Sequence, residues 1–458
     1  VLYSRALEIT ETDSALSRRF DLLSGRRRSF RRRGLAPDER RDLDQLLKLS
    51  RKLGDKSKEV EVLIWRSSYF AGLGSYDEAE REANNALVLS HELGDSTLVS
   101  RCLTRVANAE RWQGQTSDAI QTAEKAVQTI GNSDDEKAKA ECLINLGLIY
   151  DDVGRSKDAE VCLRDALFLV GEAGDLEAEC NVSYLLSSTC YSQGEYEAGR
   201  EFAAHSLTLA TKIGSRRGEV ESLIRVANYH IDLGDYEAAL DHYQSSSAIA
   251  KAIGHQSGEA TSLLNMGLAL AELGRFADAR PYLDDALEIG KRINGRRTQA
   301  AALQYLGMVF EGLEQYEPSA QAYGEALRLR NEIRESARAI DSIAGLIRIA
   351  IRLGDRRTLR SGTTEILDWF ARHGANGVEY PIKVCLACIS GLQSLGEPES
   401  AKILLDEAYS LLMARANTIQ DFNLRQSFLQ RVPTNRDLIE LWNAPRISEL
   451  STGPGCQV

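Results

Sequence analysis

Glycine recurs at a fixed period of about 40 residues along most of the chain, within the range typical of repeat proteins, and this period constrains the fold more than any other feature. The first series shares one register, with Glu314 in its single non-glycine slot, and comprises Gly34, Gly74, Gly114, Gly154, Gly194, Gly234, Gly274 and Gly354. The second series lies half a period away, continues with Asn294, and comprises Gly54, Gly94, Gly174, Gly214 and Gly254. Because glycine readily takes the left-handed conformation that ends a helix, the two series predict alternate turns between helices of about 17 residues.

The residues between the glycines follow helical periodicity. Leu143, Leu146, Gly147 and Tyr150 are spaced by three and four, which places them on one face of a helix. Alanine recurs five residues after the first-series glycine, at Ala79, Ala119, Ala159, Ala239 and Ala279. Small residues at fixed places allow two helices to approach closely. The sequence therefore predicts helix pairs, and signals for β-strands are scarce.

Three stretches carry a known repeat pattern: Leu146-Gly147-Tyr150-Gly154-Ala159-Ala166, Met266-Gly267-Gly274-Phe276-Ala279-Ala286 and Leu306-Gly307-Phe310-Tyr316-Ala326. They resemble the tetratricopeptide repeat (TPR) family, and the resemblance covers roughly residues 35–415. The period is longer than that of the family, which is about 34 residues, and the family's proline at the repeat end is absent. The resemblance implies an all-α fold, a right-handed α-solenoid of about ten TPR-like helical hairpins on one continuous core.

The rest of the chain divides around this array. We expect a basic N-terminal helical junction or cap at residues 1–34, the solenoid at 35–416, a C-terminal helical cap at 417–450 and a disordered tail at 451–458. The chain does not begin with Met, and residues 14–53 and 426–442 resemble parts of large bacterial signalling ATPases. In those proteins a nucleotide-binding domain, sometimes linked to a cyclase, precedes the repeats. We therefore expect a missing N-terminal domain of the same polypeptide.

Composition indicates the cellular environment in which the chain folds. No run of uncharged apolar residues approaches the roughly 18 of a membrane span, so we expect neither a span nor a signal peptide. The eight cysteines are irregularly spaced in a long chain, which indicates reduced thiols and a cytoplasmic location. Cys385 and Cys388 have the spacing of a redox or zinc pair. They lie inside an apolar helical stretch without a second pair, so we expect core packing.

Charge is uneven along the chain. Residues 1–50 carry 12 Lys and Arg against 8 Asp and Glu, whereas the whole chain has a net charge of −11. The cluster Arg26–Arg33 could contact nucleic acid, since phosphate binding needs dense positive charge. Alternatively, it forms a solvated helix or one docked on an acidic neighbour. Because no recognition motif surrounds these arginines, we expect the second role and no nucleic-acid binding by this segment.

The sequence carries no recognisable catalytic constellation. The six histidines are dispersed, and none has the paired helical spacing of a zinc protease. A glycine-rich phosphate loop before a strand and a Gly-x-Ser-x-Gly elbow are both absent. We therefore predict no catalytic residue, no metal site and no cofactor, and a protein that is not an enzyme.

One motif stands out from the repeat pattern. Arg105-Val-Ala-Asn108 and Arg225-Val-Ala-Asn228 are identical and lie three repeats apart. In the repeat after each, Asn145 and Asn265 take the slot of the arginine. The TPR resemblance implies that these first helices line a concave groove, where asparagines grip the backbone of a bound peptide. Each arginine lies on the same face and could meet a carboxylate. The alternative is hydrogen bonding between repeats, or simple duplication history.

Together these features predict a non-catalytic scaffold or sensor module that binds a protein or peptide in its groove. The resemblance places it within a larger bacterial signal-transduction protein. Two alternatives remain open. The segment could regulate a multidomain enzyme (an ATPase, cyclase or kinase), or it could be a peptide-pheromone-type receptor that controls transcription.

Overall fold

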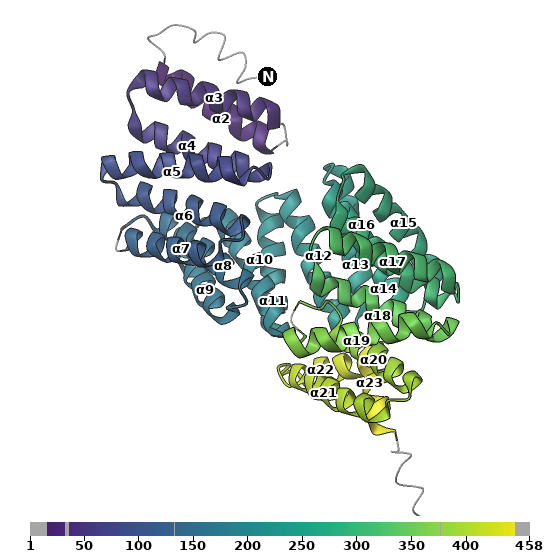
Figure 1. Ribbon diagram of the computed structural model, residues 1–458. Helices are drawn as coiled ribbons and strands as arrows, with labels where there is room; N and C mark the ends of the chain where they lie inside the picture. The colour runs from purple at the N-terminus through teal and green to yellow at the C-terminus, as the bar shows by residue number, and fades with distance from the viewer. Residues whose placement is uncertain (1–15, 33–35, 132, 376, 445–458) are drawn as a thin grey trace, which may run out of the picture. The chain divides into compact units, whose positions relative to one another are not determined.

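The computed structural model describes residues 16–32, 36–131, 133–375 and 377–444. Gly34, the start of the predicted junction, the end of the predicted cap and the predicted tail lie outside these residues. Every regular element of the described part is a helix, and the 22 helices are labelled α2 to α23 in Figure 1. Within the two compact units, nine pairs of consecutive described helices pack together, from α2–α3 to α8–α9 and from α12–α13 to α20–α21, in register with the repeat period. None of the described helices combines the length and the apolar character needed to cross a bilayer.

The chain divides into two compact units, residues 1–189 and 190–458. The helices of unit 1 are α2 (Leu16–Arg32), α3 (Ala36–Leu53), α4 (Lys56–Gly72), α5 (Tyr76–Leu93), α6 (Ser96–Trp112), α7 (Thr116–Ile130), α8 (Glu136–Asp152) and α9 (Ser156–Glu172). Helix α10 (Leu176–Gln193) contains the boundary between the two units.

Unit 2 holds the remaining helices. They are α11 (Tyr196–Lys212), α12 (Arg216–Asp232), α13 (Tyr236–Ala252), α14 (Gln256–Glu272), α15 (Phe276–Arg292), α16 (Arg296–Gly312), α17 (Tyr316–Glu332), α18 (Ser336–Leu353), α19 (Arg356–His373), α20 (Pro381–Leu395), α21 (Pro398–Ala416), α22 (Phe422–Gln430) and α23 (Pro433–Asn443).

The turns lie where the glycine period predicts them. All eleven glycines from Gly54 to Gly274 in the two predicted series have positive φ, between 64° and 80°. Asn294, Glu314 and Arg334 take the same conformation where glycine is missing. At a representative turn, Gly94 ends α5 in the left-handed region, and the Asp95 carboxylate accepts the backbone N–H of Thr97 at 2.9 Å to begin α6. The period of the turns therefore fixes the length of each helix.

Small residues hold the two helices of each pair together. The alanines at the predicted contact position, including Ala159 and Ala279, are fully buried. At the α8–α9 contact, a Cβ added to Gly147 would lie 2.9 Å from Leu163 Cγ. The helices are therefore too close for a larger residue at position 147.

The first helices of successive pairs also contact one another. In unit 1, α4 contacts α6 and α6 contacts α8; in unit 2, the same holds along α12, α14, α16 and α18. We call the surface formed by these helices the first-helix face of each unit. Side chains at equivalent repeat positions on this face are therefore neighbours in space.

The arginines at the start of unit 1 pack against acidic partners. Arg26 donates to Asp42 on α3, with Nε at 2.9 Å from Oδ2. Arg27 lies 3.6 Å from Glu39 and stacks over the ring of Trp65, 4.3 Å from its centroid. The contact between α2 and α3 thus accounts for two of the clustered arginines without a nucleic-acid partner.

The last helices of unit 2 return to its beginning. Thr418 donates to the carbonyl of Gly194 at 2.7 Å, and Ser427 donates to the carbonyl of Leu233 at 2.6 Å. The ring of Phe428 on α22 lies 5.8 Å from that of Tyr196 on α11. Unit 2 therefore closes on itself, since Thr418 and Gly194 are 224 positions apart in the sequence.

Candidate functional site

Three of the predicted site residues lie in unit 1, on two neighbouring first helices. Arg105 and Asn108 lie on α6, and Asn108 donates to the carbonyl of Thr104 one turn earlier, at 3.1 Å. Asn145 on α8 is only 3% exposed, and neither its amide nitrogen nor its oxygen has a hydrogen-bond partner among the described residues. Asn145 is therefore a buried amide whose hydrogen-bonding groups are not used by the described residues.

The other three predicted residues lie in unit 2. Arg225 and Asn228 lie on α12, and Asn265 lies on α14. Asn265 donates to Asn228 Oδ1 at 3.2 Å, and the buried Tyr243 donates to the same oxygen at 2.7 Å. The amides thus join neighbouring repeats, which was the alternative interpretation of the motif. Asn228 and Asn265 remain only partly buried, so this bond does not remove them from the surface.

One substitution explains why the two copies of the motif differ. Tyr243 on α13 supplies the hydroxyl that holds Asn228, whereas the equivalent position three repeats earlier is the fully buried Ala123. An alanine cannot donate a hydrogen bond, so Asn108 bonds to its own helix instead. The identical Arg-Val-Ala-Asn stretches therefore sit in different surroundings.

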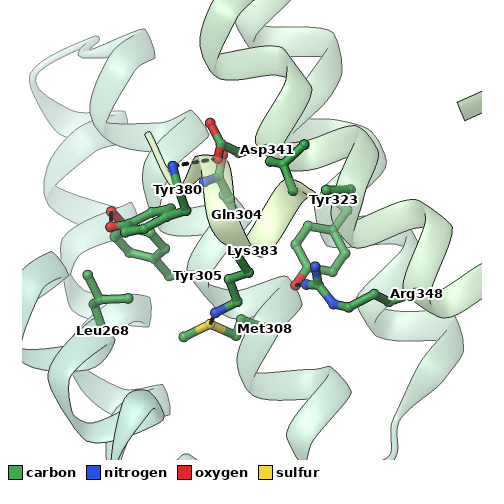
Figure 2. A pocket seen from close by; sticks show the side chains of 11 residues that line it. Leu268, Gln304, Tyr305, Met308, Tyr323, Asp341, Arg348, Tyr380 and Lys383 are labelled. Atoms are coloured by element: carbon green, nitrogen blue, oxygen red, sulfur yellow. Dashed lines mark hydrogen bonds between the residues drawn. The ribbon is translucent and has the colours of Figure 1, made fainter. Parts of the chain in front are cut away.

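Residues spaced by whole repeats from Asn228 line a pocket on the first-helix face of unit 2. Leu268, Met308 and Arg348 follow Asn228 one, two and three repeats later, and all three line the pocket. Tyr305, one repeat after Asn265, lines it too. The cavity measures about 30 Å³, and Figure 2 shows the side chains of α14, α16, α17, α18 and the start of α20 around it.

An arginine–glutamate pair forms one side of the pocket. Arg348 Nε lies 2.8 Å from Glu311 Oε1, and its Nη2 lies 2.9 Å from Glu311 Oε2. The same Nη2 donates to Tyr323 Oη at 2.9 Å. Burial alone would raise the pKa of Glu311, but the charge of Arg348 outweighs it and the pKa is lowered overall. The pair is thus held in its ionised form.

A buried carboxyl group forms the opposite side. Asp341 on α18 is 7% exposed and accepts the backbone N–H groups of Glu379 at 3.0 Å and Tyr380 at 2.9 Å. The second of these bonds is drawn in Figure 2. Burial, followed by the charge of Glu379, raises the pKa of Asp341 to about 7. Asp341 therefore fixes the start of α20 and titrates near neutrality.

Residues at the start of α20 complete the lining. Tyr305 Oη donates to Glu379 at 2.9 Å and lies 3.1 Å from Tyr380 Oη. Lys383 donates to Glu272 at the end of α14, at 3.0 Å. Helix α20 is thereby tied to α14, α16 and α18 by side-chain contacts.

The cysteines take no part in this site. Cys385 and Cys388 are buried in α20, and burial raises the pKa of each thiol to about 12. Such thiols are not nucleophilic near neutral pH. The prediction of core packing for this pair is confirmed.

Comparison with known proteins agrees with this geometry. Residues 179–252 and 258–332 match the tetratricopeptide repeat family model. These residues contain tetratricopeptide repeats. No curated protein matches it in sequence.

Solved structures share the TPR fold at low identity. A Rap protein complexed with competence and sporulation factor has a TM-score of 0.59 at 15% identity, covering 79% of this chain and 100% of that one. The apo quorum sensor NprR from B. thuringiensis has a TM-score of 0.56 at 15% identity, covering 80% and 99%. A signal transduction ATPase with numerous domains (STAND) from Pyrococcus horikoshii, which has a TPR sensor, has a TM-score of 0.56 at 18% identity. That match covers 75% of this chain and 54% of the ATPase.

The predicted site residues Asn228 and Asn265 lie on the same first helices or in the same register as part of the pocket lining, but none of the six predicted residues lines the pocket itself. The signal was present in part, because stepping by whole repeats from Asn228 and Asn265 reaches Arg348 and Tyr305. The contribution of α20 had no such signal. Chemically, the pocket offers hydrogen bonds and paired charges on a rigid helical frame, an arrangement suited to recognition.

Proposed function

We propose that this TPR array is a non-catalytic module that binds a protein or peptide along the first-helix face of unit 2. One observation carries the proposal. Polar side chains occupy two registers of the first helices, with Arg225, Asn265 and Tyr305 in one and Asn228 and Arg348 at the two ends of the other. A side-chain amide both donates and accepts hydrogen bonds, so it can satisfy the backbone of an extended chain whatever its sequence.

The spacing of the face suits an extended ligand. Packed helices lie about 8–10 Å apart, and an extended chain advances about 3.3 Å per residue. About three ligand residues therefore pass from one first helix to the next. A ligand that passes over the asparagines of α12 and α14 would reach the pocket at the side chains through which α20 contacts α14 and α16.

The same features argue against a catalytic role. Arg348 and Lys383 are each engaged by a carboxylate, and the buried thiols have raised pKa values. A nucleophile activated by a neighbouring base is not found among the pocket residues. The site therefore supplies hydrogen bonds to a ligand and holds it in a fixed position.

The setting we propose is the sensor or scaffold part of a larger signalling protein. In support, the chain resembles a STAND ATPase with a TPR sensor and spans 54% of that protein's length. A second candidate is a receptor for a small signalling peptide. It is favoured by the likeness to a Rap protein solved with a signalling factor and to the quorum sensor NprR.

Binding can be tested without knowing the natural partner. Peptides of about ten residues, long enough to cross the face, would be selected from a random display library on the full chain, and their Kd measured by fluorescence anisotropy. Asn228→Ala or Arg225→Met should weaken binding by roughly 1–3 kcal/mol, because a ligand group loses its partner. Arg217→Met, which changes an exposed arginine on the same helix, is the matched control. Peptides that bind the double variant Arg225→Met/Asn228→Ala as tightly as the parent would refute the proposed face.

A further inference from the structure

The pocket on the first-helix face of unit 2 contains hydrogen-bonding groups that the protein itself does not use. Gln304 on α16 is 5% exposed and accepts from Ser342 Oγ through its Oε1, at 3.2 Å. Among the described residues its Nε2 has no acceptor. Because Gln304 lines the pocket, the uncovered part of this side chain faces the cavity. A donor in a largely buried amide that lacks an acceptor indicates where a ligand acceptor would be stabilised.

Acceptors are present in the same cavity. Each Asp341 oxygen accepts one backbone N–H, and a carboxylate oxygen can accept a second hydrogen bond. On the other side, Arg348 uses Nε and Nη2 for Glu311 and Tyr323, while its Nη1 has no partner in the described part of the chain. The cavity thus offers donors and an acceptor together.

The charges of the pocket disfavour an ionic ligand. Arg348 is neutralised by Glu311, and Lys383 is neutralised by Glu272. The two ion pairs leave no surplus positive charge for a carboxylate or phosphate. The remaining carboxyl group, Asp341, already accepts two backbone N–H groups, and burial raises its pKa to about 7, which reduces its negative charge near neutral pH and with it the attraction for a cation. A neutral group that donates and accepts hydrogen bonds fits this balance.

The volume of the cavity also limits which chemical groups can bind in it. A cavity needs about 10–15 Å³ for each water-sized group, so about 30 Å³ holds about two to three such groups. A primary amide has three non-hydrogen atoms, its oxygen, its nitrogen and the carbon that joins them. An aromatic ring or a phosphate is too large.

We propose that this pocket binds a primary carboxamide, such as the side chain of an Asn or Gln residue of the ligand. Its oxygen accepts from Gln304 Nε2 and its N–H₂ donates to Asp341. The inference rests on the proposed function, because it places one ligand side chain beside the asparagines of the same face. It names Gln304 and Asp341 as the residues that determine specificity.

Acetamide is the direct probe. Saturation-transfer NMR on the full chain should show saturable acetamide binding, at least tenfold tighter than that of acetate. Gln304→Met keeps the volume but removes the donor, and it should weaken acetamide at least tenfold. Gln299→Met is the control, because Gln299 is a similarly buried glutamine on α16 that donates to the carbonyl of Gly290, at 3.0 Å. Ala344→Val places a larger side chain in the lining of the pocket, and it should also abolish the binding of acetamide.

Several results would overturn the assignment. They are tighter binding of acetate than of acetamide, equal loss in Gln304→Met and Gln299→Met, or no saturable binding to the parent. Peptides selected on the parent should contain Asn or Gln at one position, and this preference should vanish on Gln304→Met. If acetamide fails while Arg225→Met still weakens selected peptides, only the pocket assignment is wrong and the proposed function stands.

Discussion

The left-handed turns give a quantitative test of the repeat architecture. Gly274 has a φ of 73°, and a Cβ added there would have nothing within 4 Å. The cost of Gly274→Ala is therefore backbone strain alone, about 1–2 kcal/mol for a non-glycine residue in this conformation. Gly324 in α17 has equally free space around an added Cβ and no positive φ. Gly324→Ala should instead stabilise unit 2 by about 0.5–1 kcal/mol, because it relieves the entropic cost of a glycine within a helix.

Glu314 provides the reverse experiment. It occupies the glycine slot with a φ of 59°. Glu314→Gly should relieve about 1–2 kcal/mol of strain and lose about 0.5–1 kcal/mol to chain entropy, which leaves a net stabilisation of about 0.5–1 kcal/mol. Urea unfolding monitored by circular dichroism measures all three variants, and hydrogen exchange locates the change in the α14–α17 region. If Gly274→Ala and Gly324→Ala shift the free energy of unfolding in the same direction, the assignment of strain to the turn is refuted.

Two further predictions concern packing and pH. Ala159→Phe or Ala279→Phe should destabilise the fold by about 1–3 kcal/mol or more, because each alanine is fully buried at a helix contact; thermal midpoints equal to the parent's would contradict this. Burial raises the pKa of Asp341 from 3.8 to about 7, so between these pH values the native state holds a proton that the unfolded state has released. The free energy of unfolding should therefore fall as pH rises through this range. Urea unfolding between pH 4 and pH 8 should therefore show a steeper decline for the parent than for Asp341→Asn, and parallel curves would rule out Asp341 as the titrating group.

The repeat period predicted the fold because local chemistry determines it. Glycines at the turns and alanines such as Ala159 act within one or two helices, so their effect can be read from spacing alone. The candidate site depends on longer-range contacts. Lys383 reaches Glu272 across 111 residues, and no periodic signal marks it. Likewise, the different bonding of Asn108 and Asn228 depends on Ala123 and Tyr243, which belong to second helices.

The return of α22 to the start of unit 2 has a consequence for how this part of the molecule unfolds. An open array of repeats can lose its end units one at a time, since each repeat contacts only its neighbours. Here the hydrogen bonds from Thr418 and Ser427 tie the last helices to the first. Neither end can fray without breaking contacts made by the other, so unit 2 should unfold in a single cooperative step. Contacts between residues so distant in sequence also slow folding, because a long loop must close before they form.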